Sequence, residues 1–358
     1  MSVLRQGWAS DGSGILNSRP RASRRSGSAL IVALWVLLIL SLLIGSFAYD
    51  MQVEANITSF YRKRLKSQFV ARAGLEYAKL FLAKSLTAKK EGPEDDEDED
   101  TYVKAMNLQR GMGLSGVSQN VGQGKFTLDI LPEAGRRNVN KLTDDDWEEI
   151  LDQANVPQEK WAELIDCFND WVDSDDAQRL NGAESDDPYY VQRGYKCKNG
   201  PLDTVDELLL IKGFTQSIVF GGPAEDPKAE PYLGIAQVLT TWGDGKVDVN
   251  DAVQKVLMTI PGMEDYDVQD IIDGRKGLDK QEGTKDDGFE SVDEVISKLG
   301  VSGALAQKIR DRITTTAGGV YRIISIGEVQ GVKSGIWCVM RLDQTGTTPL
   351  FWREEDMP

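Results

Sequence analysis

The stretch RRSGSALIVALWVLLILSLLIGSFAYD, from Arg24 to Asp50, decides how the rest of the chain is interpreted. It contains 21 residues without a charge, Ser28 to Ala48. A helix of that length rises about 31 Å, the hydrocarbon thickness of a bilayer, whereas the apolar core of a secretory signal has only ~7–15 residues. The length therefore predicts a transmembrane helix over residues 28–48. Ordinary signal-peptide removal after Ser46-Phe47-Ala48 is the alternative.

The charges on the two sides of this run differ in sign. Arginines precede it, and Asp50 and Glu54 follow it. Because basic residues stay in the cytoplasm, we expect the N-terminus to be cytoplasmic and the chain from Asp50 onward to lie outside the cytoplasm.

The sequence after the apolar run lacks a helix breaker. From Tyr49 to Leu86 there is no proline and one glycine, Gly74. Apolar side chains recur there every four residues, which is typical of one helix face and predicts a single helix of roughly 55 residues, continuing over 49–88. The predicted apolar stripe is Ile57, Tyr61, Leu65, Phe69, Ala73 and Tyr77.

The composition excludes several classes of function. The chain has no histidine, which removes Ser-His-Asp and Cys-His catalysis and the commonest zinc ligand. We therefore predict that the protein is not an enzyme. A net charge of −16 repels nucleic acid and favours bound cations, so no nucleic-acid partner is expected.

Beyond the long helix the chain divides into segments of different composition. Residues 91–100 hold eight acidic side chains, so we expect a solvated linker over 89–101, with a role in attracting calcium as the alternative. Alternating apolar residues predict strands over 102–140 and a terminal antiparallel meander over 318–354. The predicted fold class is α+β.

Two phrases occur twice between these strand regions. Asn138-Val139-Asn140 is echoed 110 residues later by Asp248-Val249-Asn250, and TVDELLLIKGF from Thr204 is echoed by SVDEVISKLGV from Ser291. Such echoes indicate two related helical modules, over 141–240 and 241–317. The turns IKGF, IPGM and KLGV resemble helix-hairpin-helix turns, and their acidic surroundings favour helix stops over DNA contacts.

An acidic segment of the first module is the candidate metal site. DCFNDWVDSDDAQRLNGAESDDPYY, from Asp166 to Tyr190, crowds carboxylates at a helix end and returns more of them after Asn181-Gly182. Calcium prefers about six to eight oxygen ligands from a flexible loop, and a divalent cation reverses the repulsion between carboxylates. We predict a structural Ca²⁺ and no organic cofactor, with a solvated acidic loop as the alternative. The candidate ligands are Asp170, Asp173, Asp175, Asp176, Glu184 and Asp187.

Two further features of the sequence leave alternatives. Cys167 and Cys197 lie in one module of an extracytoplasmic chain, which allows either a disulfide or two buried thiols. The segment GDGKVDVNDAV fits part of a dockerin-like calcium loop, but Thr240 and Trp242 stand where its first two carboxylates belong. A strand and a helix cap are therefore predicted there.

The N-terminal residues carry a family resemblance. A basic leader ending in Gly27, the small residue Ser28 and an apolar helix that continues as an amphipathic one resemble the class-III signal of type IV pilin-like proteins. The resemblance implies that prepilin peptidase removes the leader, residues 1–27, by cutting between Gly27 and Ser28, and methylates Ser28.

Further residues narrow the resemblance to one kind of pilin-like protein. Most pilins have glutamate at the fifth mature position, where this chain has Val32; drift in a generic anchor is the alternative explanation. The chain lacks this glutamate and contains the phrases DWVDSDD, NVN, PGM and FWRE. In these features it resembles the minor pseudopilin K family of type II secretion. That family implies a long N-terminal helix packed on a small antiparallel sheet, with an inserted helical domain of two helix-hairpin-helix or SAM-like modules that binds calcium.

The same resemblance implies a function and partners. It implies a single-pass inner-membrane subunit, periplasmic at its C-terminal domain, that sits at the pseudopilus tip and supports protein export across the outer membrane. Its implied partners are the I-type and J-type, then H-type, minor pseudopilins and the major pseudopilin. A pilus-like or dockerin-like binding module is the alternative. The stripe from Ile57 to Tyr77 is expected to pack on the protein's own sheet and on the helices of neighbouring subunits. The residues expected to pack between subunits are Val32, Ile57, Tyr61, Leu65, Phe69, Ala73 and Tyr77.

Overall fold

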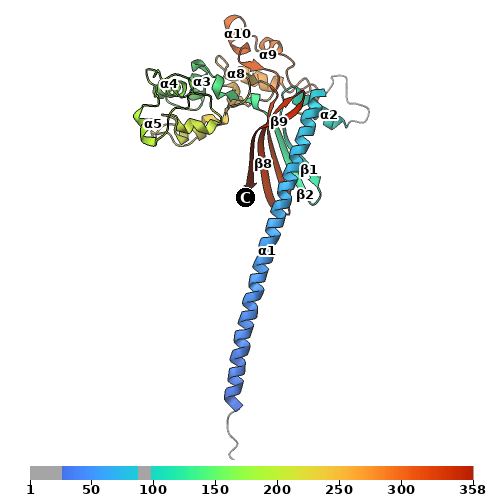
Figure 1. The fold of residues 1–358 in the computed structure, drawn as a ribbon. Coiled ribbons are helices and arrows are strands. Elements are labelled where there is room, and N and C mark those ends of the chain that lie inside the picture. Colours follow the sequence, from blue (N-terminus) through green and yellow to red (C-terminus); the bar gives the residue numbers. More distant parts are fainter. Residues whose placement is uncertain (1–25, 88–97, 358) are drawn as a thin grey trace, which may run out of the picture. The chain divides into compact units, whose positions relative to one another are not determined.

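The computed structural model describes residues 26–87 and 98–357 and has an α+β fold with a long N-terminal helix and an antiparallel sheet (Figure 1). It divides into two compact units, Met1–Tyr61 and Arg62–Pro358. Most of the predicted leader, 1–27, and most of the predicted linker, 89–101, lie outside the described residues.

Helix α1, Ser26–Thr87, is a single helix of 62 residues, so the predicted long helix is confirmed. Its apolar first part is exposed throughout residues 28–48, as expected for side chains that meet lipid. Within the described residues, Ser28–Thr87 is the helix with a stretch long and apolar enough to cross a bilayer.

The main sheet joins two regions that are far apart in the sequence. Its strand order is β1-β2-β7-β8-β9, and every neighbouring pair is antiparallel. The pairing of β2 with β7, from Lys125 opposite Glu328 to Pro132 opposite Tyr321, closes the sheet around the long insert. The strands are β1 (Leu114–Val121), β2 (Gly124–Pro132), β7 (Val320–Val329), β8 (Val332–Asp343) and β9 (Gly346–Met357).

The prediction of strands from residue 102 is wrong at its beginning. Helix α2 occupies Glu99–Gln109, and the Asp98 side chain accepts a hydrogen bond from the Thr101 amide at its N-terminus. Its buried side chains, Tyr102, Ala105 and Met106, have helical spacing. Strand β1, which follows, has an almost fully exposed sequence, LSGVSQNV, and therefore lacks the alternation that would have predicted it.

The face of α1 that packs on the sheet is not the predicted stripe. The buried side chains of its last turns share a core with the inner face of the sheet, and they are Val70, Ala71, Leu75, Ala78, Phe81 and Leu82. Leu65 and Phe69 remain exposed, at 54% and 59%, and Tyr77 is half-buried against Phe126. Small residues form much of the contact between α1 and the sheet. A stripe chosen from the largest apolar side chains therefore lies on the helix face next to the one in contact.

Glycines allow α1 to approach the sheet closely. A Cβ on Gly74 would stand 2.2 Å from the Ser325 hydroxyl, and a Cβ on Gly327 would stand 2.1 Å from the Ser67 carbonyl oxygen. Hydrogen bonds form at this distance: Ser325 Oγ donates to the Ala71 carbonyl at 2.8 Å. The contact is therefore fixed by backbone proximity as well as by apolar burial.

The insert between β2 and β7 is mostly helical and has two short parallel bridges. In one, Arg137–Asn138 (β3) pairs with Leu239–Thr240 (β4); in the other, Val247–Asp248 (β5) pairs with Ile313–Thr314 (β6). Its buried apolar side chains, from Val139 to Ile313, form one continuous cluster. The helices are α3 (Asp144–Gln153), α4 (Trp161–Val172), α5 (Pro188–Arg193), α6 (Gln216–Phe220), α7 (Gln254–Leu257), α8 (Asp265–Gly274), α9 (Val292–Leu299) and α10 (Gly303–Arg310), with the 3-10 turns Glu133–Gly135, Val139–Lys141, Gln158–Lys160, Val205–Leu210 and Ile235–Gln237.

Candidate metal centre

Helix α4 carries the first carboxylate of the acidic cluster into the protein. Its inner face buries Leu164, Phe168 and Trp171, and the same face brings Asp170 to zero exposure near the end of the helix. The Asp170 carboxylate accepts the Arg179 amide hydrogen at 3.2 Å. The helix amphipathicity therefore buries a charge whose protein partners are backbone amides.

The returning chain brings a second buried carboxylate to the first. A Cβ on Gly182 would stand 1.9 Å from Asp170 Oδ2, so the close approach requires glycine there. Two residues later Glu184 is 2% exposed, and neither of its carboxylate oxygens has a hydrogen-bond partner. Carboxylate oxygens of Asp170, Asp173 and Glu184 lie within 4.8 Å of one another.

The electrostatics of this trio favour a bound cation. Burial, followed by the charges of Asp170 and Asp173, raises the pKa of Glu184 to about 7. Burial also raises the pKa of Asp170 and of Asp173. Asp173 Oδ1 and the neighbouring Asn199 Oδ1 lack partners as well. Hard oxygen atoms without donors, gathered around a small space, match the ligand preference of Ca²⁺.

The other predicted ligands divide between two positions. Asp176 lies close enough to add to the raised pKa of Glu184, and with Glu184 and Asn199 it lines a depression open to solvent. Asp175 accepts the Ala177 amide hydrogen at 2.9 Å. Asp187 is not brought to the trio, because its carboxylate caps α5 through the Tyr189 amide and pairs with Lys212 Nζ at 2.9 Å.

The structure has a second acidic cluster, Asp279, Asp286 and Asp287, which was not predicted from the sequence. Its carboxylates are already satisfied: Asp287 accepts the Gly283 and Thr284 amides, and Asp286 accepts the Leu278 amide at 2.7 Å. The two clusters have similar composition but differ in their donors. Orphaned buried oxygens distinguish the first cluster, and the sequence does not reveal them.

Of the two alternatives for Cys167 and Cys197, the structure has two thiols. Cys167 and Cys197 are free thiols, whose sulfur atoms point to the Asn181 and Ala183 carbonyls at 3.7 and 3.5 Å. Burial raises the pKa of Cys167 to about 12 and that of Cys197 to about 11, so both stay protonated at neutral pH. They pack as small apolar side chains.

The segment that fits part of a dockerin-like loop forms buried contacts in short strands. Thr240 is buried in β4 and its hydroxyl donates to Glu133 Oε2 at 2.5 Å. Asp248 is buried in β5 and accepts the Asn250 amide. The strand predicted in GDGKVDVNDAV is β5, whereas the predicted helix cap is not found: α7 begins later, at Gln254, and its N-cap residue Val253 makes no side-chain hydrogen bond.

Comparison with known proteins supports the family resemblance. Residues 124–220, which run from β2 through the acidic cluster to α6, match the family model of type II secretion system (T2SS) protein K. This part of the chain is therefore similar to a protein K domain. The protein K family is a structural component of the pseudopilus and not an enzyme family, which agrees with the prediction of a non-catalytic protein. No curated protein matches the sequence significantly.

A solved structure shows the same fold around the protein K domain. It is the crystal structure of the GspK-GspI-GspJ complex from the enterotoxigenic Escherichia coli type 2 secretion system. The similarity has a TM-score of 0.54 at 12% sequence identity, and it covers 82% of this chain and 100% of the matched chain. At this identity the fold is what the two chains share.

Proposed function

We propose that the protein is a non-enzymatic minor pseudopilin at the tip of a type II secretion pseudopilus, where it joins other minor pseudopilins to initiate assembly and support export. The observation that carries this proposal is the insert. The region that matches the protein K model, 124–220, begins with β2 and continues into the insert that separates β2 from β7, on a chain with an N-terminal helix apolar enough for a bilayer.

The N-terminal helix supports an assembly role. Its apolar residues between Val32 and Phe69 are exposed in the single chain, although α1 turns another face to its own sheet. A row of exposed aromatic and aliphatic side chains on a helix outside the bilayer needs a partner surface. We assign Ile57, Tyr61, Leu65 and Phe69 to contacts with I-type and J-type subunits, and then with H-type and major pseudopilins.

Processing and location follow from the same helix. We assign cleavage by prepilin peptidase between Gly27 and Ser28, with an inner-membrane anchor over 28–48 and a periplasmic C-terminal domain. Mass spectrometry of the mature protein should find methyl-Ser28 at the N-terminus. A protein beginning at Tyr49 would show ordinary signal-peptide removal and would exclude a pseudopilin.

Co-expression tests the assembly role. The chain from residue 28, purified from cells that also make I-type and J-type pseudopilins, should elute with both partners. Replacing Leu65 and Phe69 by serine should release them, whereas replacing the exposed residues Arg62 and Lys66 by serine serves as a control. A chain that stays monomeric beside both partners would exclude the tip-subunit function.

We further propose that Asp170, Asp173 and Glu184 hold a structural Ca²⁺, with oxygens of Asp176 and Asn199 nearby. A bound ion supplies the positive charge that these buried carboxylates lack, and it ties the end of α4 to the segment after Gly182. The site fits because four of its oxygens have no other partner.

Thermal unfolding tests the calcium site. The unfolding free energy should rise by about 2.7 kcal/mol when free Ca²⁺ is a hundredfold above its dissociation constant. Asp170→Asn should abolish this increase, and Asp286→Asn, in the satisfied cluster, should leave it unchanged. An increase that survives Asp170→Asn would place the ion elsewhere.

A further inference from the structure

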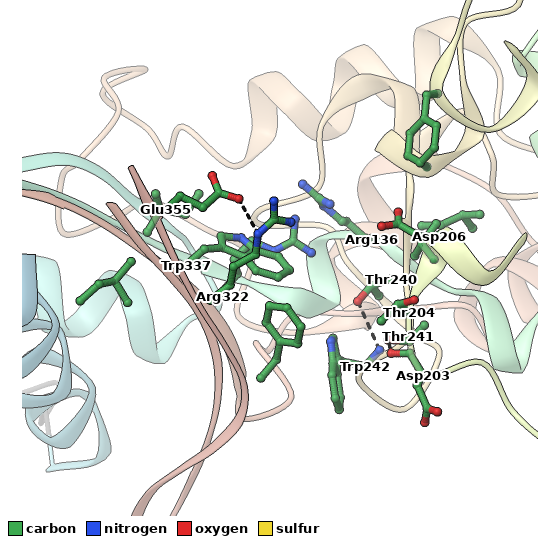
Figure 2. Close-up of a pocket in the computed structure, with 18 of the residues that line it drawn as sticks. Arg136, Asp203, Thr204, Asp206, Thr240, Thr241, Trp242, Arg322, Trp337 and Glu355 are labelled. Carbon is green, nitrogen blue, oxygen red and sulfur yellow. Dashed lines mark hydrogen bonds and ion pairs between the residues drawn. The ribbon is translucent and has the colours of Figure 1, made fainter. Parts of the chain in front are cut away.

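A cavity of about 480 Å³ lies between the outer face of the main sheet and the insert, away from the acidic cluster (Figure 2). The sheet contributes side chains from three neighbouring strands, including Arg322, Trp337 and Phe351. The insert contributes Thr204, Asp206 and Trp242, and the turn after β2 contributes Arg136. Neither the metal site nor the helix contacts use this space.

The walls of the cavity offer aromatic surface. Trp337 and Phe351 form an edge-to-face pair with ring centroids 4.6 Å apart, and the Arg322 guanidinium lies 5.2 Å from the Trp337 ring. Phe220 and Trp242 face the same space from the insert. Such walls bind flat or branched apolar groups and exclude water from charged groups beside them.

The arginines that line the cavity differ in their partners. Arg322 is held by both oxygens of Glu133, at 2.7 and 3.1 Å, and Arg353 pairs with Glu355 at 2.6 Å. The Arg136 guanidinium has no hydrogen bond or ion pair in the described part of the chain. Figure 2 shows it between Arg322 and Asp206. Burial, followed by the charge of Arg322, lowers the pKa of Arg136 to about 10, and the charges of Glu133 and Asp251 oppose this only in part. In a chain with net charge −16, an unmatched guanidinium calls for an anion from outside.

The edge of the sheet next to the cavity is free. Strand β9 is last in the strand order, and in the described residues it pairs on one side only, with β8. Its side chains alternate: Phe351, Arg353 and Glu355 line the cavity, while Glu354 points the other way and pairs with Arg72 of α1 at 2.9 Å. A strand added beside β9 would therefore direct every second side chain toward the cavity.

We propose that this cavity and the free edge of β9 bind an extended segment of a partner protein that carries an acidic side chain near an aromatic or branched apolar one. The carboxylate pairs with Arg136, the apolar group packs on Trp337 and Phe351, and the main chain pairs with β9. Charge complementarity to the unpaired guanidinium selects this peptide chemistry, and it goes beyond any role as a tip subunit.

Peptide selection tests the docking site. Random heptapeptides displayed on phage are selected on the purified full-length chain in detergent and, in parallel, on Arg136→Gln. We expect enrichment of Asp or Glu within two positions of an aromatic or branched apolar residue on the wild type, and its loss on Arg136→Gln. Arg341→Gln, an exposed arginine outside the cavity, should retain the enrichment, and Arg136→Lys should retain part of it. No enrichment, or the same enrichment on Arg136→Gln, would overturn the proposal.

Synthetic peptides then separate the two parts of the site. Trp fluorescence titration measures the dissociation constants of the best end-blocked peptide and of its Gln-for-Glu or Asn-for-Asp analogue. On the wild type the acidic peptide should bind at least tenfold more tightly than its analogue. On Arg136→Gln the two peptides should bind equally. Methylation of alternate backbone nitrogens should weaken binding at least tenfold if the peptide pairs with β9. Equal binding of the methylated peptide, or displacement by phenylpropionate at the peptide's own dissociation constant, would show a small-molecule pocket and contradict docking. Unchanged melting temperatures of the variants confirm that each is folded.

Discussion

Asn140 and Asn250 make the same two hydrogen bonds in the two halves of the insert. Asn140 donates to the Leu202 carbonyl at 3.0 Å and accepts the Leu202 amide at 2.7 Å; Asn250 does the same with Phe289, at 3.0 and 2.7 Å. Each partner lies two positions before one of the phrases TVDEL and SVDEV. Each half of the insert therefore has one such contact, in which the asparagine of the first repeated motif binds the backbone just before the second repeated motif.

Removing either amide should destabilise the insert. Asn250 is 4% exposed and also donates to the Arg110 carbonyl, so Asn250→Ala leaves several buried backbone groups without partners. We expect a loss of about 2–4 kcal/mol for Asn250→Ala and a smaller loss, about 1–2 kcal/mol, for the half-buried Asn140→Ala. Urea unfolding followed by circular dichroism measures both. Asn120→Ala, on the exposed edge strand β1, should stay within about 0.5 kcal/mol of wild type. Losses as small for Asn250→Ala would contradict a structural role.

The close contact of α1 with the sheet makes a second prediction. Gly327→Ala would place Cβ against backbone atoms, 2.1 Å from the Ser67 carbonyl oxygen and 2.4 Å from the Ala71 nitrogen, which cannot rotate away. We expect a loss of about 2–4 kcal/mol, because α1 must move off the sheet. Gly200→Ala, whose nearest neighbour is 3.9 Å away, is the matched control. Equal stability of the two variants would show that the helix is not seated as described.

The long helix, the terminal meander and the echoes of the insert were predictable because each leaves a periodic or repeated pattern. The packing face of α1 was not, because the contact uses Ala71, Gly74 and Ala78, which a hydrophobic stripe overlooks. Helix α2 was hidden by its acidic start, which resembled the linker before it. Strand β1 lies inside the range predicted as strands, 102–140, but its bounds could not be predicted, because an edge strand with exposed side chains has no alternation.

The acidic site was predictable as a segment and not as a ligand set. Sequence proximity suggested that Asp187 belonged to it, yet the start of α5 turns that side chain toward Lys212. What distinguishes Glu184 is the absence of donors around it, a property of the folded chain. The same holds for Arg136, whose isolation depends on Glu133 being occupied by Arg322 from a strand 189 positions away.

The acidic site should make stability depend on pH in the absence of calcium. The folded-state pKa of Glu184, about 7, lies above the ordinary value of 4.5, so the folded state holds the proton more tightly. The resulting stabilisation is present below pH 4.5 and is lost as pH rises to 7. In EGTA, Glu184→Gln should therefore be more stable than wild type at pH 8, by roughly 2–3 kcal/mol, and not at pH 4. With Ca²⁺ the order at pH 8 should reverse. A calcium effect that is the same in both proteins would remove Glu184 from the site.

Asp248 should behave as a second buried acid, without a cation. It is fully buried in β5, its Oδ2 has no partner, and burial raises its pKa well above the ordinary value. Ionising it in the folded state is unfavourable, so its contribution to stability is full below about pH 4 and declines as pH rises. Asp248→Asn should be more stable than wild type at pH 8 by about 1–3 kcal/mol and equal to it near pH 4. Asp270→Asn, on the exposed face of α8, should show no such difference between pH 4 and pH 8 in guanidinium unfolding. A loss of stability in Asp248→Asn at pH 8 would mean that the carboxylate is ionised and bound to an unseen donor.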